Sequence, residues 1–202
     1  MYVSIDHVTK DFRGKPAALD DVTIDLPTGM IGLLGSNGAG KTTLMRMLCG
    51  IVQPTRGTVR VDGRDLADRR VRQAVRKALG YLPQHVDPYP NLTPLEFLDY
   101  VGILKGVDRR AARRRQAREL VERVGLADAQ DRRIGGFSGG MRRRVGIAQA
   151  LMGDPELIIV DEPTAGLDSA NTGVVLRLLR EAADRGAAVL IVTHEPEADR
   201  FA

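Results

Sequence analysis

The sequence has no tryptophan, few other aromatic residues and one cysteine. Aromatic side chains make up 4% of the 202 residues and hydrophobic residues 43%, so a core must be built mainly from aliphatic side chains. The lone Cys49 excludes an intramolecular disulfide framework and a cysteine-rich zinc site. Unbroken apolar runs, such as residues 157–160, are much shorter than the roughly 20 residues that a membrane-spanning helix needs. We therefore expect one domain with no membrane span of its own.

Charge is almost balanced, with 30 basic and 26 acidic residues and a formal net charge of +4. The basic excess is concentrated in residues 105–123, which hold eight basic and three acidic side chains. Such a stretch can contact nucleic acid, lie near anionic lipid head groups or form a solvated helix face. No aromatic residues are interleaved with its arginines, which weighs against single-stranded nucleic acid, and the solvated face is the default interpretation.

Two kinds of strand pattern occur. Residues 22–26 and 58–63 alternate apolar and polar side chains, and a shorter strand is expected near Val3 and Ile5, ending at Asp6-His7. Alternation suits an antiparallel sheet with one solvated face. A second group of runs is apolar on both faces, which suits parallel strands covered by helices, and it comprises residues 30–34, 157–160 and 188–192.

Helical patterns fall between these strands, at residues 42–49, 140–152 and 171–185. We therefore predict an α/β fold with a mainly parallel core sheet and an N-terminal antiparallel β subdomain. Residues from about 85 to 135 are expected to form an inserted helical subdomain, with helices at 94–104 and 108–124. In the second helix Asp108 is the expected N-cap, and an apolar stripe consists of Ala117, Leu120, Val121 and Val124.

The strongest motif is a glycine-rich loop at residues 35–43 that fits the pattern G-x-x-x-x-G-K-[ST] in full. It follows a predicted buried strand and opens a predicted helix, which is the context of a phosphate-binding loop. We expect Lys41 to contact the β and γ phosphates of a nucleotide and the Thr42 hydroxyl to ligate Mg²⁺. The expected nucleotide-binding residues of the loop are Gly35, Ser36, Asn37, Gly38, Ala39, Gly40, Lys41, Thr42 and Thr43.

A pair of carboxylates, Asp161 and Glu162, follows the apolar run 157–160. A buried strand that ends in a carboxylate is where phosphate-loop enzymes hold Mg²⁺, and Asp161 is expected in that role. Glu162 is expected to polarise the water that attacks the γ phosphate. Together with the loop, the pair predicts nucleotide hydrolysis.

With further motifs in the same order, the chain resembles the ATP-binding subunits of ABC transporters over nearly its whole length. Residues 137–141, Phe-Ser-Gly-Gly-Met, are similar to the LSGGQ signature of that family. Four smaller elements match singly: Phe12 the aromatic that stacks on adenine, Gln84 the Q-loop, Asp168 the D-loop and His194 the H-loop. The phosphate loop and Met141 look most like the multidrug or ABC-2-type exporters.

This resemblance implies further site residues. Ser138, Gly139 and Gly140 would bind the γ phosphate of a nucleotide held by another subunit, and Asp168 would bridge the two subunits. Gln84 would touch Mg²⁺ and the attacking water. His194 would contact the γ phosphate and hold Glu162 and its water, which makes it a catalytic residue together with Glu162 and Lys41.

The resemblance also implies a function: an ATP hydrolase that uses ATP and Mg²⁺ and powers a membrane transporter, with export favoured over import. Its expected partners are a second ATPase subunit, identical or not, and separate transmembrane permease subunits at the cytoplasmic face of the membrane, with nucleic acid an unlikely partner. Two alternatives stay open, a soluble ABC-type ATPase acting on nucleic acid or ribosomes and a degenerate regulatory nucleotide-binding module.

The sequence departs from the family pattern at a few positions. Phe137 and Met141 replace the usual Leu and Gln of the signature, and Gly166 stands where many members carry Ala or Leu. Because the serine and glycines of the signature are kept, we expect ATP binding to survive. Family members usually continue past the position of His194 by several dozen residues, so the C-terminal end is expected to be truncated relative to the family.

Overall fold

A computed structural model describes residues 1–14, 16–36 and 38–193, and within them the chain forms two four-stranded sheets. The first sheet is antiparallel with the order β2-β1-β4-β5, and the second is parallel with the order β3-β8-β7-β6. The strands are β1 (Val3–Lys10), β2 (Leu19–Leu26), β3 (Gly29–Leu34), β4 (Arg56–Val61), β5 (Arg64–Asp65), β6 (Leu79–Leu82), β7 (Leu157–Asp161) and β8 (Ala188–Thr193). The predicted α/β class, with a parallel core sheet and an N-terminal antiparallel sheet, is confirmed.

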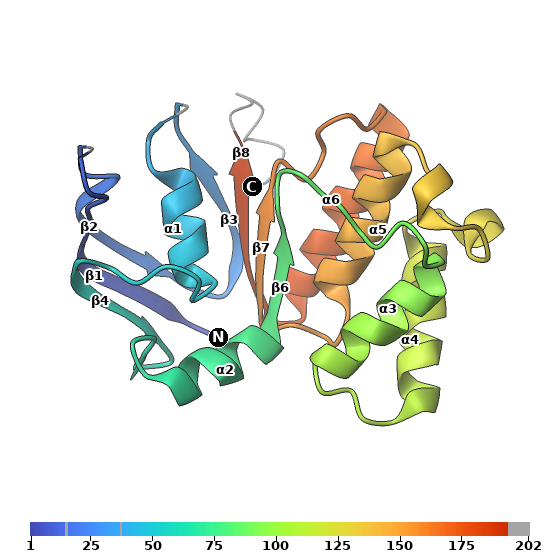
Figure 1. Ribbon diagram of the computed structural model, residues 1–202, viewed down its shortest axis with the longest axis horizontal. Helices are drawn as coiled ribbons and strands as arrows, with labels where there is room; N and C mark the ends of the chain where they lie inside the picture. The colour runs from blue at the N-terminus through green and yellow to red at the C-terminus, as the bar shows by residue number, and fades with distance from the viewer. Residues whose placement is uncertain (15, 37, 194–202) are drawn as a thin grey trace.

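Helices cover the parallel sheet on one face, and the antiparallel sheet with two further helices covers the other (Figure 1). The helices are α1 (Lys41–Leu48), α2 (Arg69–Ala78), α3 (Pro94–Leu104), α4 (Arg110–Arg123), α5 (Gly139–Leu151) and α6 (Ser169–Asp184), with short 3₁₀ turns at Ala127–Ala129 and Ile134–Gly136. Of the helices within the described residues, none has both the length and the apolar character that crossing a membrane requires.

Strand β7 shows why the parallel strands are apolar throughout. Leu157 and Ile159 belong to the core that contains α1 and the inner face of the antiparallel sheet. Ile158 and Val160 belong to the core that contains α5 and α6. All four side chains are buried, and burial of each apolar side chain stabilises the fold by about 1.5–3 kcal/mol. Neither face of β7 can therefore take a polar residue before Asp161.

Strand β3 departs from the expectation that its run would be buried on both faces. Its residues are half-buried or exposed, and Leu34 keeps 52% of its surface accessible. Within the described residues β3 has one neighbour, β8, because it lies at the edge of the parallel sheet. The edge position of β3 thus leaves its apolar residues partly exposed.

The first strand does not end at Asp6-His7 as the sequence suggested. It continues to Lys10 through an irregularity in its pairing with β2, between Ile5 and Val8. His7 sits at this irregularity with φ at 47°, and its ring contacts Asp21 at 2.8 Å. A bulge of this kind breaks the alternation of side chains without breaking the strand.

The segment expected as a helical insertion contains α3, α4 and both 3₁₀ turns, and the predicted stripe of α4 is buried. The prediction that Asp108 caps α4 is wrong, because the N-cap is Arg109 and no side chain caps the helix. Arg113 reaches back from the first turn instead, and its Nη1 donates to the carbonyls of Val107 (2.8 Å) and Asp108 (2.9 Å). Its Nε also pairs with Asp99 at 3.0 Å, so this arginine of the basic stretch is a buried structural residue.

Helix α2 and strand β6 were not predicted from the sequence. Helix α2 has only Val75 fully buried, and the Asp68 side chain caps it by accepting from the Arg70 N–H at 2.6 Å. Strand β6 follows directly and pairs with β7, with Leu82 opposite Val160. Lys105 closes the junction, since its Nζ donates to the carbonyls of Leu79 and Arg76. Because β6 and β7 are parallel neighbours, Gln84 after β6 and Glu162 after β7 lie at the same edge of the sheet.

Gly80 in β6 lies close to the main chain of helix α5, and this contact can be tested. A methyl group built on Gly80 would lie 2.0 Å from the carbonyl oxygen of Ala150 in α5, a main-chain atom that cannot swing away. We expect Gly80→Ala to destabilise the protein by about 1–3 kcal/mol, measured by urea unfolding.

Gly32 in β3 is the matched control, because a methyl group there meets nothing within 4 Å. Gly32→Ala should change the free energy of unfolding by no more than about 0.5 kcal/mol. Equal effects of the two substitutions would contradict the packing of α5 on β6.

Candidate functional site

A cavity of about 230 Å³ lies at the edge where the parallel strands end. Parallel strands bring their carboxyl ends to one side of a sheet, and ligands bind in the crevice that forms there. The cavity gathers residues from five separate parts of the chain. Its lining consists of Ala18, Ser36, Gly38, Ala39, Gly40, Lys41, Thr42, Thr43, Gln84, Asp161, Glu162 and Val192. The predicted loop, the predicted acidic pair and Gln84 therefore share one cavity.

The glycine-rich loop turns into α1 at Gly40, which takes a left-handed conformation with φ at 84°. A side chain on Gly40 would place a methyl group 2.2 Å from the carbonyl oxygen of Ala18, so only glycine fits. No side chain among the described residues caps α1, and the first N–H groups of a helix have no partner within the helix. These donors and the helix dipole favour an anion at the N-terminus of α1, which fits the phosphates of a nucleotide.

Lys41 is the first residue of α1, and its side chain folds back over the loop. The Nζ atom donates to the carbonyl oxygens of Gly35 and, at 2.9 Å, Ser36. The ammonium group is thus held at the cavity by neutral acceptors. A phosphate oxygen is a stronger acceptor than a carbonyl, so a nucleotide can take over these bonds.

Asp161 ends β7, and Glu162 follows it at the floor of the cavity. Both residues are buried. The Thr193 hydroxyl donates to the Glu162 carboxylate at 3.2 Å, and the Glu162 N–H donates to the Val192 carbonyl at 2.8 Å. Glu162 has φ at 50°, a left-handed conformation that non-glycine residues seldom adopt. Backbone of this kind is concentrated at functional sites.

The oxygen donors of the cavity fit Mg²⁺. Thr42, Gln84 and Asp161 contribute a hydroxyl, an amide and a carboxylate to one lining. Mg²⁺ is usually held by one or two protein oxygens plus substrate phosphates, without a cage of carboxylates. No cluster of three or more His, Cys, Asp or Glu occurs among the residues that the structure describes. The donor set therefore suits a metal that arrives with a nucleotide.

Other predicted residues do not line this cavity. Phe12 is exposed (42%), with Lys10 Nζ 5.2 Å from its ring centre. Ser138, Gly139 and Gly140 begin α5 elsewhere on the molecule, and Asp168 precedes α6. Asn37 and His194 lie outside the described residues.

Ser138 and Asp168 cap the helices that follow them. Ser138 Oγ accepts from the Met141 N–H at 3.2 Å, and the Asp168 carboxylate accepts from the Asn171 N–H at 2.8 Å. The bonds from the main chain and side chain of Asn171 lower the pKa of the Asp168 carboxyl. Both residues thus have a local structural role in the monomer.

Arg143, a buried residue in the second turn of α5, was not predicted from the sequence. Its guanidinium donates to the main-chain oxygens of Gln84 and Pro83 and to those of Asp161 and Glu162. One arginine among several in α5 carries no local sequence signal for such a contact, because its partners are distant in the chain.

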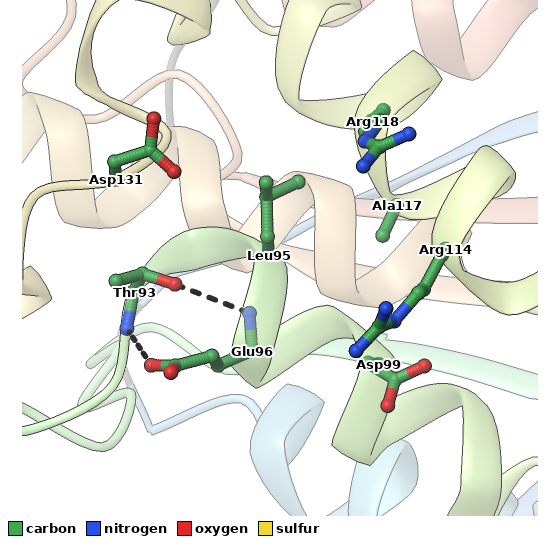
Figure 2. A pocket seen from close by; sticks show the side chains of 8 residues that line it. All are labelled: Thr93, Leu95, Glu96, Asp99, Arg114, Ala117, Arg118 and Asp131. Atoms are coloured by element: carbon green, nitrogen blue, oxygen red, sulfur yellow. Dashed lines mark hydrogen bonds between the residues drawn. The ribbon is translucent and has the colours of Figure 1, made fainter. Parts of the chain in front are cut away.

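A second cavity, of about 270 Å³, lies between α3 and α4 (Figure 2). Arg114 and Arg118 of α4 line it together with Asp99 of α3 and Asp131. Thr93 and Glu96, also in the lining, bond to each other's main-chain N–H in a capping box. With opposite charges mixed in this way, it suits phosphates less well than the cavity at the sheet edge.

Comparisons with known proteins agree with this geometry. The family model described as ABC transporter matches residues 19–165. The uncharacterized ABC transporter ATP-binding protein YxlF of Bacillus subtilis is 40% identical over 95% of this chain. The daunorubicin/doxorubicin resistance ATP-binding protein DrrA of Streptomyces peucetius is 40% identical over 92% of it. The chain spans 62% and 56% of the lengths of these two relatives.

Solved structures give the same result. The dimeric structure of MJ0796, a bacterial ABC transporter cassette, has a TM-score of 0.89 and 28% identity, covering 98% of this chain and 90% of that one. A post-hydrolysis state of the same cassette, dimeric and bound to ADP and Pi, has a TM-score of 0.89 and 29% identity, with the same coverage. The match spans the fold and the site, and the chain therefore belongs to the ATP-binding proteins of the ABC transporter family.

Proposed function

We propose that this protein binds and hydrolyses MgATP to drive a membrane transporter. The observation that carries the proposal is the single cavity that combines a phosphate loop, Lys41 and the buried Asp161–Glu162 pair. The post-hydrolysis state of the MJ0796 cassette, which is bound to ADP and Pi, supports this proposal, because that protein has a similar structure.

The roles of the residues follow from their places in the cavity. The N-terminus of α1 and Lys41 would bind the β and γ phosphates, and Thr42, Asp161 and Gln84 are the residues that would hold Mg²⁺. When bound, Mg²⁺ neutralises phosphate charge and orients the γ phosphate. Glu162 accepts a proton from the attacking water, with Thr193 fixing one of its carboxylate oxygens. Because little covalent chemistry is needed, positioning supplies most of the rate.

The remaining residues act around a bound nucleotide. Phe12 stacks on the adenine ring, and Gly35–Thr43 as a whole encloses the phosphates. His194 holds the water and the γ phosphate with Glu162. Ser138, Gly139 and Gly140 complete the site of a second ATPase subunit, with Asp168 at the subunit boundary. The dimeric form of the MJ0796 cassette supports this last assignment.

The partners are a second ATPase subunit, identical or related, and separate permease subunits at the cytoplasmic face of the membrane. We propose export as the direction of transport. The resemblance to DrrA, named for drug resistance, supports export, and so do the sequence around the phosphate loop and Met141. Relatives named for phosphonate and methionine import have similar identities, so direction rests on these details alone.

Replacement of Lys41 tests the phosphate loop. Loss of one charge-assisted bond to phosphate costs about 1.5–3 kcal/mol, so Lys41→Ala should weaken MgATP binding roughly ten- to a hundred-fold by titration calorimetry. Lys77→Ala, which removes an exposed lysine from α2, is the control and should bind normally. Normal MgATP binding by Lys41→Ala would refute the assignment of the loop.

Replacement of Glu162 separates binding from hydrolysis. Glu162→Gln keeps the size of the side chain and removes the proton acceptor, so the rate of phosphate release should fall by about a hundred-fold or more while MgATP affinity stays within about two-fold. Glu156→Gln, at the exposed start of the same strand region, is the matched control. A Glu162→Gln protein with undiminished turnover would show that another group activates the water.

Direction of transport can be measured with the partner present. The permease subunit should co-purify with this chain, and inside-out membrane vesicles that contain both should accumulate substrate when MgATP is supplied outside. Vesicles with the Glu162→Gln chain are the control and should not accumulate it. Accumulation only in right-side-out vesicles with internal MgATP would assign the system to import.

A further inference from the structure

Arg143 joins two segments that belong to different parts of the chain. Its Nη1 donates to the carbonyl oxygens of Pro83 at 3.1 Å and Gln84 at 2.7 Å. Its Nη2 donates to the carbonyl oxygens of Asp161 and Glu162. The side chain is buried, with 6% of the residue accessible. One guanidinium therefore bonds to the main chain on both sides of the cavity floor.

The sheet itself does not hold these segments together. The paired register of β6 and β7 ends at Leu82 and Val160. Pro83 has no N–H with which to extend the ladder. Beyond this point Gln84 and Glu162 follow separate loops, and Arg143 spans the gap between them. Its planar fork has fixed donor directions, which suits it to define the relative position of two peptide groups.

The charge of Arg143 is compatible with its place. Burial lowers the pKa of the guanidinium, and the nearby carboxylates of Asp161 and Glu162 oppose that shift. An arginine stays protonated in proteins, so a buried cation stands behind two acidic residues. Because the hydrogen bonds of its guanidinium go to main-chain oxygens, Arg143 fixes the backbone of the acidic pair, including the left-handed Glu162.

Arg143 also lies on the helix that Ser138 begins. Helix α5 is a rigid element, and Ser138 is five positions before Arg143. A shift of α5 would move the guanidinium and both of the segments that it holds. The N-terminus of α5, Gln84 and Glu162 are thus connected through one side chain.

We propose that Arg143 is a positioning residue that keeps the Gln84 segment and the Glu162 peptide in one geometry, and so couples movement of α5 to the activation of water. The proposal rests on the proposed ATP hydrolysis for its kinetic consequences. Its structural content, the tie between residues 83–84 and 161–162, holds in the protein without nucleotide.

The first test is hydrogen exchange on the nucleotide-free protein. In Arg143→Gln the amides of residues 84–87 and 161–165 should both exchange about ten-fold faster than in the wild type, because each segment loses the hydrogen bonds that its carbonyl oxygens accept from Arg143. Arg113→Gln is the matched control, since Arg113 is equally buried (8%) and also donates to loop carbonyls, but in the helical insertion. It should leave both segments unchanged.

The second test is the split between kcat and KM for ATP hydrolysis. Arg143→Gln should lower kcat by about ten- to a hundred-fold, the effect of misplacing a reacting group, and change KM by less than about two-fold. Arg113→Gln should lower stability without this loss of kcat. Combined with Gln84→Ala, Arg143→Gln should reduce kcat by less than the product of the two single effects, because both disturb one unit.

Exchange that stays at wild-type rates in either segment, or a kcat no lower than that of Arg113→Gln, would overturn the proposal. If Arg143→Gln does not fold, Arg143→Lys keeps the charge with one donor group. It should then show a smaller increase in hydrogen exchange and a smaller loss of kcat. A wild-type protein that does not hydrolyse ATP would defeat the proposed function instead, and the exchange experiment would still decide the role of Arg143.

Discussion

The parallel pairing of β3, β8, β7 and β6 is the constraint on which the site depends. Its register places Leu33 opposite Val192, Val192 opposite Asp161 and Val160 opposite Leu82, so that the loops beyond four strands open at one edge. Both faces of β7 are packed against different cores, and a slip by one residue would exchange those faces. The burial that fixes the register therefore also fixes where Asp161 and Glu162 enter the cavity.

Cations at this edge are held by backbone oxygens. Lys41 bonds to carbonyls of its own loop, and Arg143 bonds to carbonyls on either side of the cavity floor. The two arrangements have different consequences. Lys41 is partly accessible and can exchange carbonyls for phosphate oxygens, with a gain in bond strength. Arg143 is buried, and loss of its partners would leave a desolvated charge, so its geometry resists change.

The sequence predicted functional residues correctly where they are adjacent in the chain and form a short motif. The loop at 35–43 and the pair Asp161–Glu162 are short motifs on predicted strands, and their shared cavity follows from the parallel sheet. Errors arose at element boundaries, where the local pattern does not decide the outcome. Helix α4 begins one residue later than predicted, with Arg109 as its N-cap, and β1 continues past His7 because a bulge in its pairing with β2 accommodates the break in alternation. Arg143 could not be found, since its partners are 18 to 60 residues away in the chain.

The composition of the cavity also supports a shared site. Among the described lining residues, Lys41 is the one cationic side chain, and the N-terminus of α1 adds only a partial charge. A triphosphate carries several negative charges, more than Lys41 and one Mg²⁺ ion together neutralise, so further donors to the γ phosphate would be favourable. Helix α5 opens with Ser138 and two glycines at an exposed N-terminus that does not line the cavity. Supplied by a second subunit, such an N-terminus would add N–H donors on the open side of the nucleotide, and α5 would carry the resulting movement to Arg143.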